Sequence, residues 1–353
     1  KQPPFTSSFY IFNNLHKSRM ETIPLVKASL ALPFVKFLDQ SGAPTERYLD
    51  QVHLPIDIFY DLNTLIPLHQ ACAFLELAAQ REGEELAILV AQQTQVFELG
   101  AAWPLLSQSL TLHDLLRKVL QFSRTWNSGE RVWLMNAGDY QWLHHQYLLP
   151  QFQTHQADYF VISLYLDLIR LAAGSEWQPE QIHFKCEKRK VLLELDCVSS
   201  NTQIHFNQAS DAICFSKALL SQPLMLPNTV FPSDHSTESL LSTVPADGFQ
   251  ESLCQLIQNL LPRKYPSLTI AAEAVGVSVR TLQRRLEEHQ LNYSQLVEQV
   301  RFDQAVKLLQ APSNQLIDIA FELGYTDAAN FTRAFKRWTG ISPREFRRLH
   351  LQG

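Results

Sequence analysis

Apolar residues recur at helical spacing through the last hundred residues of the chain and predict two copies of one small helical unit. The first copy covers residues 267–290 and the second covers residues 314–340. Each has a short apolar helix, a glycine in a turn, a polar residue that can cap the next helix, and a second helix containing Arg or Lys. This is the layout of a helix-turn-helix, and two in tandem indicate a module that reads DNA.

Around these copies the pattern predicts only helices. The helix at 293–309 lies between the copies and spans about 25 Å if it is regular. A stiff spacer of that length suits two recognition helices in major-groove segments one turn, about 34 Å, apart. The predicted helices cover residues 249–261, 270–275, 279–289, 293–309, 316–323, 328–338 and 343–349.

Upstream, helical spacing gives way to alternation, which predicts a mixed domain. Thr111 and Asp114 have the spacing of a capping box. The turn residues 137–139 lie between two β-rich runs, as in a hairpin. We predict helices at 24–42, 43–52, 67–81, 111–126 and 158–173, and strands at 131–136, 140–148, 181–186, 202–207 and 212–215. The fold class is an α+β domain followed by an all-α domain of two helix-turn-helix units joined by a long helix.

Composition suggests where these parts meet. Residues 223–248 hold four prolines and few large apolar residues, so they are predicted to be a linker with a short helix near 238–242. The predicted organisation is a flexible tail at 1–21, an effector-sensing or dimerisation domain at 22–222, the linker at 223–248, and a DNA-binding domain at 249–353 with its units at 268–290 and 315–340.

The N-terminal and C-terminal parts of the chain differ in net charge. The whole chain has a net charge of -5, which argues against nucleic acid as a partner. Residues 262–353, however, hold 13 Lys and Arg against 9 Asp and Glu, whereas residues 1–261 hold 17 against 26. A basic segment joined to an acidic one fits a sensor attached to a DNA binder.

In the first unit, Gly276 is predicted to form the turn and Ser278 to cap the second helix. The outer face of that helix carries Arg and Gln, which can make paired contacts to guanine and adenine edges worth about 1–3 kcal/mol of discrimination each. The outer residues are Arg280, Gln283, Arg284 and Glu287, and the inner residues are Ala271, Ala272, Val275, Leu282 and Leu286.

The second unit repeats this arrangement. Gly324 is predicted to turn the chain, and either Thr326 or Asp327 to cap the second helix. The residues predicted to face inward are Ile317, Ala320, Phe321, Phe331, Phe335 and Trp338, and those predicted to face outward are Asn330, Arg333 and Arg337.

A simpler interpretation exists for both units. Arginines on an amphipathic helix usually form a solvated face, and a helix-turn-helix can serve a structural or protein-binding role. Repetition favours DNA binding, because both capped helices carry an amide and an arginine opposite apolar anchors.

At these residues the chain resembles the DNA-binding domain of the AraC/XylS family of bacterial transcription regulators. The resemblance covers residues 249–349 and is closest in DIAFELGYTDAANFTRAFKRWTGISPREFR, residues 318–347. It implies seven helices and a site read through two successive major-groove segments. It also implies promoter DNA and RNA polymerase as partners, and a cytoplasmic location. It favours an activator over a repressor.

The resemblance assigns roles to particular positions. Ala328 and Ala329 depart from the polar residues often found there, which leaves contact with thymine methyl groups or backbone anchoring for the second helix. The base-reading positions are Arg280, Gln283, Arg284, Ala328, Ala329, Asn330 and Arg333. The positions assigned to the DNA backbone are Ser278, Thr281, Thr326, Lys336 and Arg337.

Residues 22–220 resemble a second domain, the N-terminal domain of a subgroup of this family that is labelled "arabinose-binding" and is not a cupin barrel. The most similar stretch is residues 23–55. The resemblance implies a small-molecule effector and often a homodimer, without identifying the ligand or its pocket. A domain that only oligomerises is the alternative.

Other chemistry has weaker support. His144 and His145 would point to opposite faces of a strand, so joint metal binding with His155 is not expected. His183, His205 and the aromatic residues at 126, 133, 140, 142 and 147 are predicted to be core, with a pocket as the alternative. No metal, cofactor or catalytic residue is predicted.

The cysteines and the apolar runs bound the remaining function classes. The five cysteines have no metal-ligand spacing and are predicted to be reduced, with a Cys186–Cys197 redox pair as the alternative. A regulator fused to a DNA-repair alkyltransferase would need a zinc-binding cysteine cluster, so we expect no enzyme. Neither a signal peptide nor a membrane span is predicted.

Overall fold

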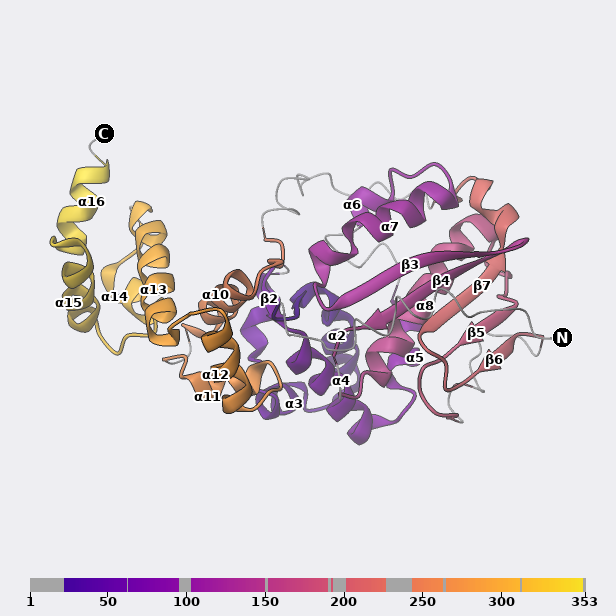
Figure 1. Cartoon of the computed structure of the whole chain (residues 1–353), viewed down its shortest axis with the longest axis horizontal. Coiled ribbons are helices and arrows are strands. Elements are labelled where there is room, and N and C mark those ends of the chain that lie inside the picture. The colour runs from indigo at the N-terminus through magenta and orange to yellow at the C-terminus, as the bar shows by residue number, and fades with distance from the viewer. Residues whose placement is uncertain are drawn as a thin grey trace.

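The computed structural model describes residues 22–61, 63–94, 103–149, 152–189, 192, 201–226, 243–262, 265–311 and 313–351. Within these residues a sheet with its covering helices forms one end of the molecule, and the C-terminal helices extend from it to the other end (Figure 1). The predicted α+β part followed by an all-α part is confirmed.

The larger sheet has the strand order β3-β4-β7-β5-β6. β3 and β4 form the predicted antiparallel hairpin, with Gly138 at a φ of +64° in its turn. β5 and β6 are parallel, and the other neighbours are antiparallel. The strands of this sheet are β3 Glu130–Ala137, β4 Tyr140–Tyr147, β5 Gln181–His183, β6 Gln203–His205 and β7 Asp211–Ser216.

Helices cover one side of this sheet. The longest, α8, is apolar along most of its length and begins at His155, three residues before its predicted start. The side chain of Thr111 accepts a hydrogen bond from the backbone of Asp114, as the capping pattern predicts. The helices are η2 Ala28–Leu30, α2 Leu32–Ser41, α3 Thr45–Gln51, η3 Ile56–Tyr60, α4 Leu68–Glu82, α5 Leu86–Gln93, α6 Trp103–Leu106, α7 Leu112–Trp126, α8 His155–Ala173 and η7 Lys217–Ser221.

One predicted helix was wrong at its start. Leu25–Lys27 is strand β1, and it pairs antiparallel with strand β2, Leu65–Pro67. Both strands have only three residues and are buried throughout, so neither shows an alternating pattern. A short buried strand cannot be told from a helical turn by periodicity.

The prediction that the histidines and aromatics of the sheet are core was also wrong in part. Tyr140 is 43% exposed. His205 is exposed and His183 is half-buried. Tyr140, His183 and Trp142 lie on the same face of the sheet as His144, and Trp142 packs against His183 with ring centroids 4.3 Å apart. Alternation places a residue on a face of the sheet, but it does not show whether anything covers that face.

The C-terminal part contains the predicted helices. The predicted short helix at 238–242 lies outside the described residues. The helices are α10 Phe249–Leu260, α11 Leu268–Ala274, α12 Val279–Glu288, α13 Tyr293–Gln310, α14 Leu316–Glu322, α15 Ala328–Thr339 and α16 Pro343–Leu351.

The two helix-turn-helix units belong to different hydrophobic cores. The core of the first unit includes Ile23, which precedes β1, and Leu25 and Leu65 from the β1–β2 pair, together with residues of α10, α11, α12 and the start of α13. The backbone N–H of Ile23 donates to the buried hydroxyl of Ser252 at 2.8 Å. The core of the second unit is built from the end of α13 with α14, α15 and α16. The first unit is therefore packed on the N-terminal part, and the second stands farther out (Figure 1).

His144 and His145 point to opposite sides of β4, as expected for adjacent strand residues. The ring of His144 stacks on Trp133 with centroids 4.9 Å apart and contacts the Ser210 hydroxyl at 2.9 Å. His145 is fully buried on the other side, with its Nε2 3.3 Å from Glu130 and its Nδ1 3.8 Å from Asp158. This cluster also contains Asp211, which is 2% exposed.

The cluster predicts how stability changes with pH. Burial by itself lowers the pKa of His145, but Glu130, Asp158 and Asp211 raise it above its ordinary value overall. The stabilisation from the imidazolium is complete below the unfolded-state pKa of about 6.5 and is lost as the pH rises through the higher folded-state pKa. We expect the free energy of unfolding to fall as the pH rises above about 6.5, and to fall less steeply in His145→Gln.

A neighbouring histidine supplies the control for that experiment. Burial lowers the pKa of His144 to about 4. His144 therefore affects stability at acidic pH, as the pH falls below the unfolded-state value. His144→Gln should keep the slope above pH 6.5 in urea titrations, and an equal loss of slope in both variants would contradict the assignment to His145.

Candidate nucleic-acid interface

The first helix-turn-helix has the local geometry that the sequence predicts. Gly276 has a φ of +71°, in the left-handed region. The Ser278 hydroxyl accepts a hydrogen bond from the backbone N–H of Thr281 at 3.1 Å and lies 2.9 Å from the Thr281 hydroxyl. Leu282 and Leu286 are buried and hold α12 on the core. Capping and packing thus fix the start and the orientation of α12.

The outer face of α12 carries the predicted reading residues. The side chains of Arg280, Gln283 and Arg284 are exposed and lie together on the helix surface. The Arg284 Nε is 3.7 Å from the Glu288 carboxylate, in an exposed ion pair that contributes little stability and can be exchanged for a contact to DNA. α12 therefore presents two guanidinium groups and one amide to a ligand.

In the second unit, the capping residue is Asp327 rather than Thr326. Its carboxylate accepts a hydrogen bond from the backbone N–H of Asn330 at 2.7 Å, and this bond is the main cause that lowers the pKa of Asp327. The Asn330 amide also donates to Asp327 at 2.6 Å and to the Thr326 hydroxyl at 3.1 Å. Asn330 is thus engaged in the capping network at the start of α15.

The outer face of α15 is smaller than that of α12. Arg333 is exposed and donates to the side-chain oxygen of Asn330. Ala329 is exposed, whereas Ala328 is half-buried and packs against the core of the second unit. Of the four positions assigned to base reading on α15, Ala329 and Arg333 face solvent, and Asn330 lies between them.

The positions assigned to the DNA backbone have different surroundings. Ser278 and Thr281 lie at the start of α12, and Thr326 is exposed just before α15. Lys336 is exposed near the end of α15. Arg337 donates to Glu298 of α13 at 2.7 Å, in a pair whose side chains are 65% and 54% exposed. This exposed pair joins α15 to the spacer helix.

The prediction that Ile317 and Phe321 face inward was wrong. They are 37% and 51% exposed, whereas Ile319, Ala320 and Leu323 are buried. α14 has only seven residues, so two overlapping stripes of apolar residues fit its sequence equally well. Packing against α13 and α15 selects the stripe containing Ile319 and Leu323.

Two arginines to which the sequence analysis assigned no role are buried. Arg285 is 6% exposed and donates to Glu288 at 2.7 Å. Arg301 is 8% exposed and donates to the carbonyl oxygens of Leu323 and Gly324 at 3.0 and 3.1 Å. A signal was present in the spacing, because Arg285 follows Leu282 by three residues and Arg301 lies four residues from both Val297 and Ala305.

Comparisons with known proteins agree with the presence of a helix-turn-helix domain. A helix-turn-helix domain family matches residues 271–349, and the family described as the arabinose-binding domain of AraC transcription regulators, N-terminal, matches residues 42–224. The second match covers more than half of the chain. The resemblance stated from the sequence is therefore confirmed.

Individual relatives match over shorter stretches. The ornithine utilization regulator of Pseudomonas aeruginosa is 33% identical over 147 residues, which is 40% of this chain and 42% of that protein. The transcriptional activator FapR of Escherichia coli is 36% identical over 108 residues, 31% of this chain and 41% of that protein. The chain thus spans about two fifths of the length of these relatives. Their names are those of regulators, which supports the prediction that the chain is not an enzyme.

A solved structure is similar over more of the chain. The transcriptional regulator CdpR of Pseudomonas aeruginosa matches with a TM-score of 0.38 and 18% identity, over 86% of this chain and 96% of that one. Among the described residues, no helix is both long and apolar enough to cross a membrane.

Proposed function

Because the chain belongs to the AraC family of transcription regulators, we propose that it binds promoter DNA with α12 and α15 in successive major-groove segments and activates transcription in response to a small molecule. The observation that carries this proposal is the pair of capped helices whose outer faces hold Arg280, Gln283, Arg284 and Arg333.

The two recognition helices differ in the polar side chains that they offer to DNA bases. α12 offers three long polar side chains to the bases, whereas the outer face of α15 offers one exposed arginine, Arg333, beside Ala329. Sequence preference should therefore come mainly from α12, and α15 should contribute more to anchoring.

The other parts of the chain complete the proposal. Residues 22–222 would sense the effector and form a homodimer, residues 223–248 would link the two parts, and residues 249–353 would contact DNA and RNA polymerase in the cytoplasm. The resemblance of residues 42–224 to the N-terminal domain of the family supports the sensing role. The name of FapR, a transcriptional activator, supports activation.

Binding to DNA selected from a random pool by the full chain tests the base-reading residues. Arg284→Ala and Arg333→Ala should each weaken binding to the selected sequence by about 1–3 kcal/mol, which is roughly 5- to 150-fold, and relax the preference at one position. Fluorescence anisotropy at fixed salt measures this loss. Unchanged affinity in both variants would refute the residue assignment.

Two lysine variants distinguish contacts to the DNA backbone from contacts to the bases. Lys336→Ala should weaken all sequences alike and reduce the slope of log affinity against log salt by about one, because one phosphate contact is lost. Lys36→Ala removes the same charge from an exposed position on α2, in the N-terminal part. That control should leave both the affinity and the salt slope unchanged.

A further inference from the structure

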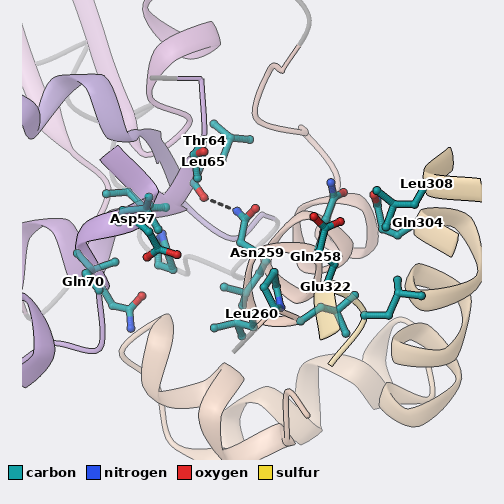
Figure 2. A pocket seen from close by; sticks show the side chains of 18 residues that line it. Asp57, Thr64, Leu65, Gln70, Gln258, Asn259, Leu260, Gln304, Leu308 and Glu322 are labelled. Atoms are coloured by element: carbon teal, nitrogen blue, oxygen red, sulfur yellow. Dashed lines mark hydrogen bonds between the residues drawn. The ribbon is translucent and has the colours of Figure 1, made fainter. Parts of the chain in front are cut away.

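A cavity of about 330 Å³ lies where the N-terminal part meets α10, the spacer helix α13 and the second helix-turn-helix unit. Figure 2 shows its lining: side chains from η3, β2 and the start of α4 face those from the end of α10, from α13 and from α14. The Asn259 amide donates to the carbonyl oxygen of Leu65 across this junction. The size of the cavity is within the range of small-molecule sites.

The walls of the cavity belong to the two separate cores. Leu65, Leu256 and Leu260 line it and are part of the core shared by the N-terminal part and the first unit. Leu308 and Leu323 line it and belong to the core of the second unit. An occupant would therefore contact both bodies at once.

The first unit is also held against the N-terminal part by a contact outside this cavity. A Cβ atom added to Gly276 would lie 2.2 Å from the His69 ring of α4, so the turn of the first unit packs directly on that helix. The second unit is attached through α13 and through the approach of Gly324 to the end of α10. A ligand in the cavity would thus act on the position of the second unit.

One buried amide in the lining has no partner among the described residues. Gln70 is 6% exposed, lines the cavity, and its side chain makes no hydrogen bond to the described part of the chain. Gln70 is therefore available to hydrogen-bond an occupant.

The described residues of the lining carry charge of one sign only. Asp57 and Glu322, both exposed, contribute carboxyl groups from opposite walls, and none of the described lining residues is Lys, Arg or His. Amides at 258, 259 and 304 add hydrogen-bonding groups, and leucine and isoleucine side chains supply most of the remaining surface. Such a lining favours a ligand with a positive group and an aliphatic chain.

We propose that this cavity binds a small organic cation, an alkylammonium compound, and that the bound cation fixes the second helix-turn-helix against the rest of the protein. Binding selects the arrangement in which both walls are in contact with the ligand. The spacing of α12 and α15 then becomes a property that the ligand controls. The control of DNA binding rests on the proposed function, whereas ligand binding itself does not.

Three probes of equal chain length test the ligand class. Hexylammonium, hexanoate and hexan-1-ol are titrated into the full chain by calorimetry and by thermal unfolding at constant ionic strength. Hexylammonium should bind and raise the melting temperature with increasing concentration, since a ligand specific for the folded state stabilises it. Equal binding of hexanoate, or no binding of hexylammonium up to about 10 mM, would overturn the proposal.

Variants locate the binding. Glu322→Gln and Asp57→Asn retain side-chain size and should together weaken hexylammonium at least about tenfold, the effect of losing roughly 1.4 kcal/mol of charge interaction. Gln70→Leu should weaken it as well, and Gln70→Glu, which adds a carboxyl group, should strengthen it. Glu273→Gln changes an exposed carboxyl group on α11, outside the cavity, and should have no effect. The same loss in Glu273→Gln would place the cation elsewhere.

DNA affinity with and without hexylammonium tests the coupling. It should change severalfold in the wild type, and the change should disappear in the Glu322→Gln, Asp57→Asn double variant. Binding of the cation with unaltered DNA affinity would overturn the control of the second unit. Failure of the chain to bind any DNA would refute the proposed function and leave the calorimetric result intact.

Discussion

Gly324→Ala should lower the free energy of unfolding of the second helix-turn-helix by about 2–4 kcal/mol, because two costs act at one position. Gly324 has a φ of +72°, where any side chain is strained. An added Cβ would also lie 2.6 Å from the backbone carbonyl oxygen of Leu261. That oxygen belongs to the end of α10 and cannot move away as a flexible side chain could.

Gly340 offers a matched control for this substitution. It ends α15 with a φ of +81°, and an added Cβ would have no atom within 4 Å. Gly340→Ala should therefore cost only the backbone strain, about 1 kcal/mol. Hydrogen exchange of the amides of α14 and α15 in the full-length variants compares the two. Equal destabilisation would mean that the approach to Leu261 is not the cause.

The helix-turn-helix units could be predicted from the sequence because their signals are local. Ser278 caps α12 through an N–H three residues away, and the turn glycine lies two residues before it. Burial of Leu282 and Leu286 follows from a spacing of four residues on one helix. The exposed positions of Arg280 and Arg284 follow as the opposite face.

The packing of the first unit on the N-terminal part could not be predicted from local signals. It depends on Ile23 and Leu65, which lie about two hundred residues from the α10 side chains that cover them. A three-residue strand such as β1 has too few positions to show a period. Its identity is decided by its partner β2, and that pairing is tertiary.

In the candidate site, too, local features could be predicted and tertiary contacts could not. Exposure of the reading arginines could be predicted, but the contacts made by the other polar residues of the site could not. Asn330 takes part in the cap of its own helix, and Arg337 pairs with Glu298, which lies 39 residues earlier in the chain. Sequence spacing identifies a helix face, whereas the partners of its polar groups depend on the fold around it.

Arg301→Met should be the second strongly destabilising substitution, with a loss of about 2–4 kcal/mol. The guanidinium group donates to the carbonyl oxygens of Leu323 and Gly324, which end α14 and form the turn of the second unit. It also lies 4.3 Å from the ring centre of Tyr325 and 5.0 Å from that of Tyr265. Methionine fills similar space but leaves two buried carbonyl groups without their donor.

Arg337→Met makes the same change on an exposed arginine. Its pair with Glu298 is solvated and should be worth at most about 1 kcal/mol. Hydrogen exchange of the full chain compares the two variants locally. In Arg301→Met, amides of α14 and α15 should exchange roughly 30- to 1000-fold faster, which is the factor that corresponds to the predicted loss of free energy. Amides of α11 and α12 should change little. Equal acceleration in both units would contradict the structural separation of their cores, because Arg301 contacts the turn of the second unit. Because the two cores are separate, loss of the Arg301 contacts should unfold α15 while α12, which carries Arg284, stays folded.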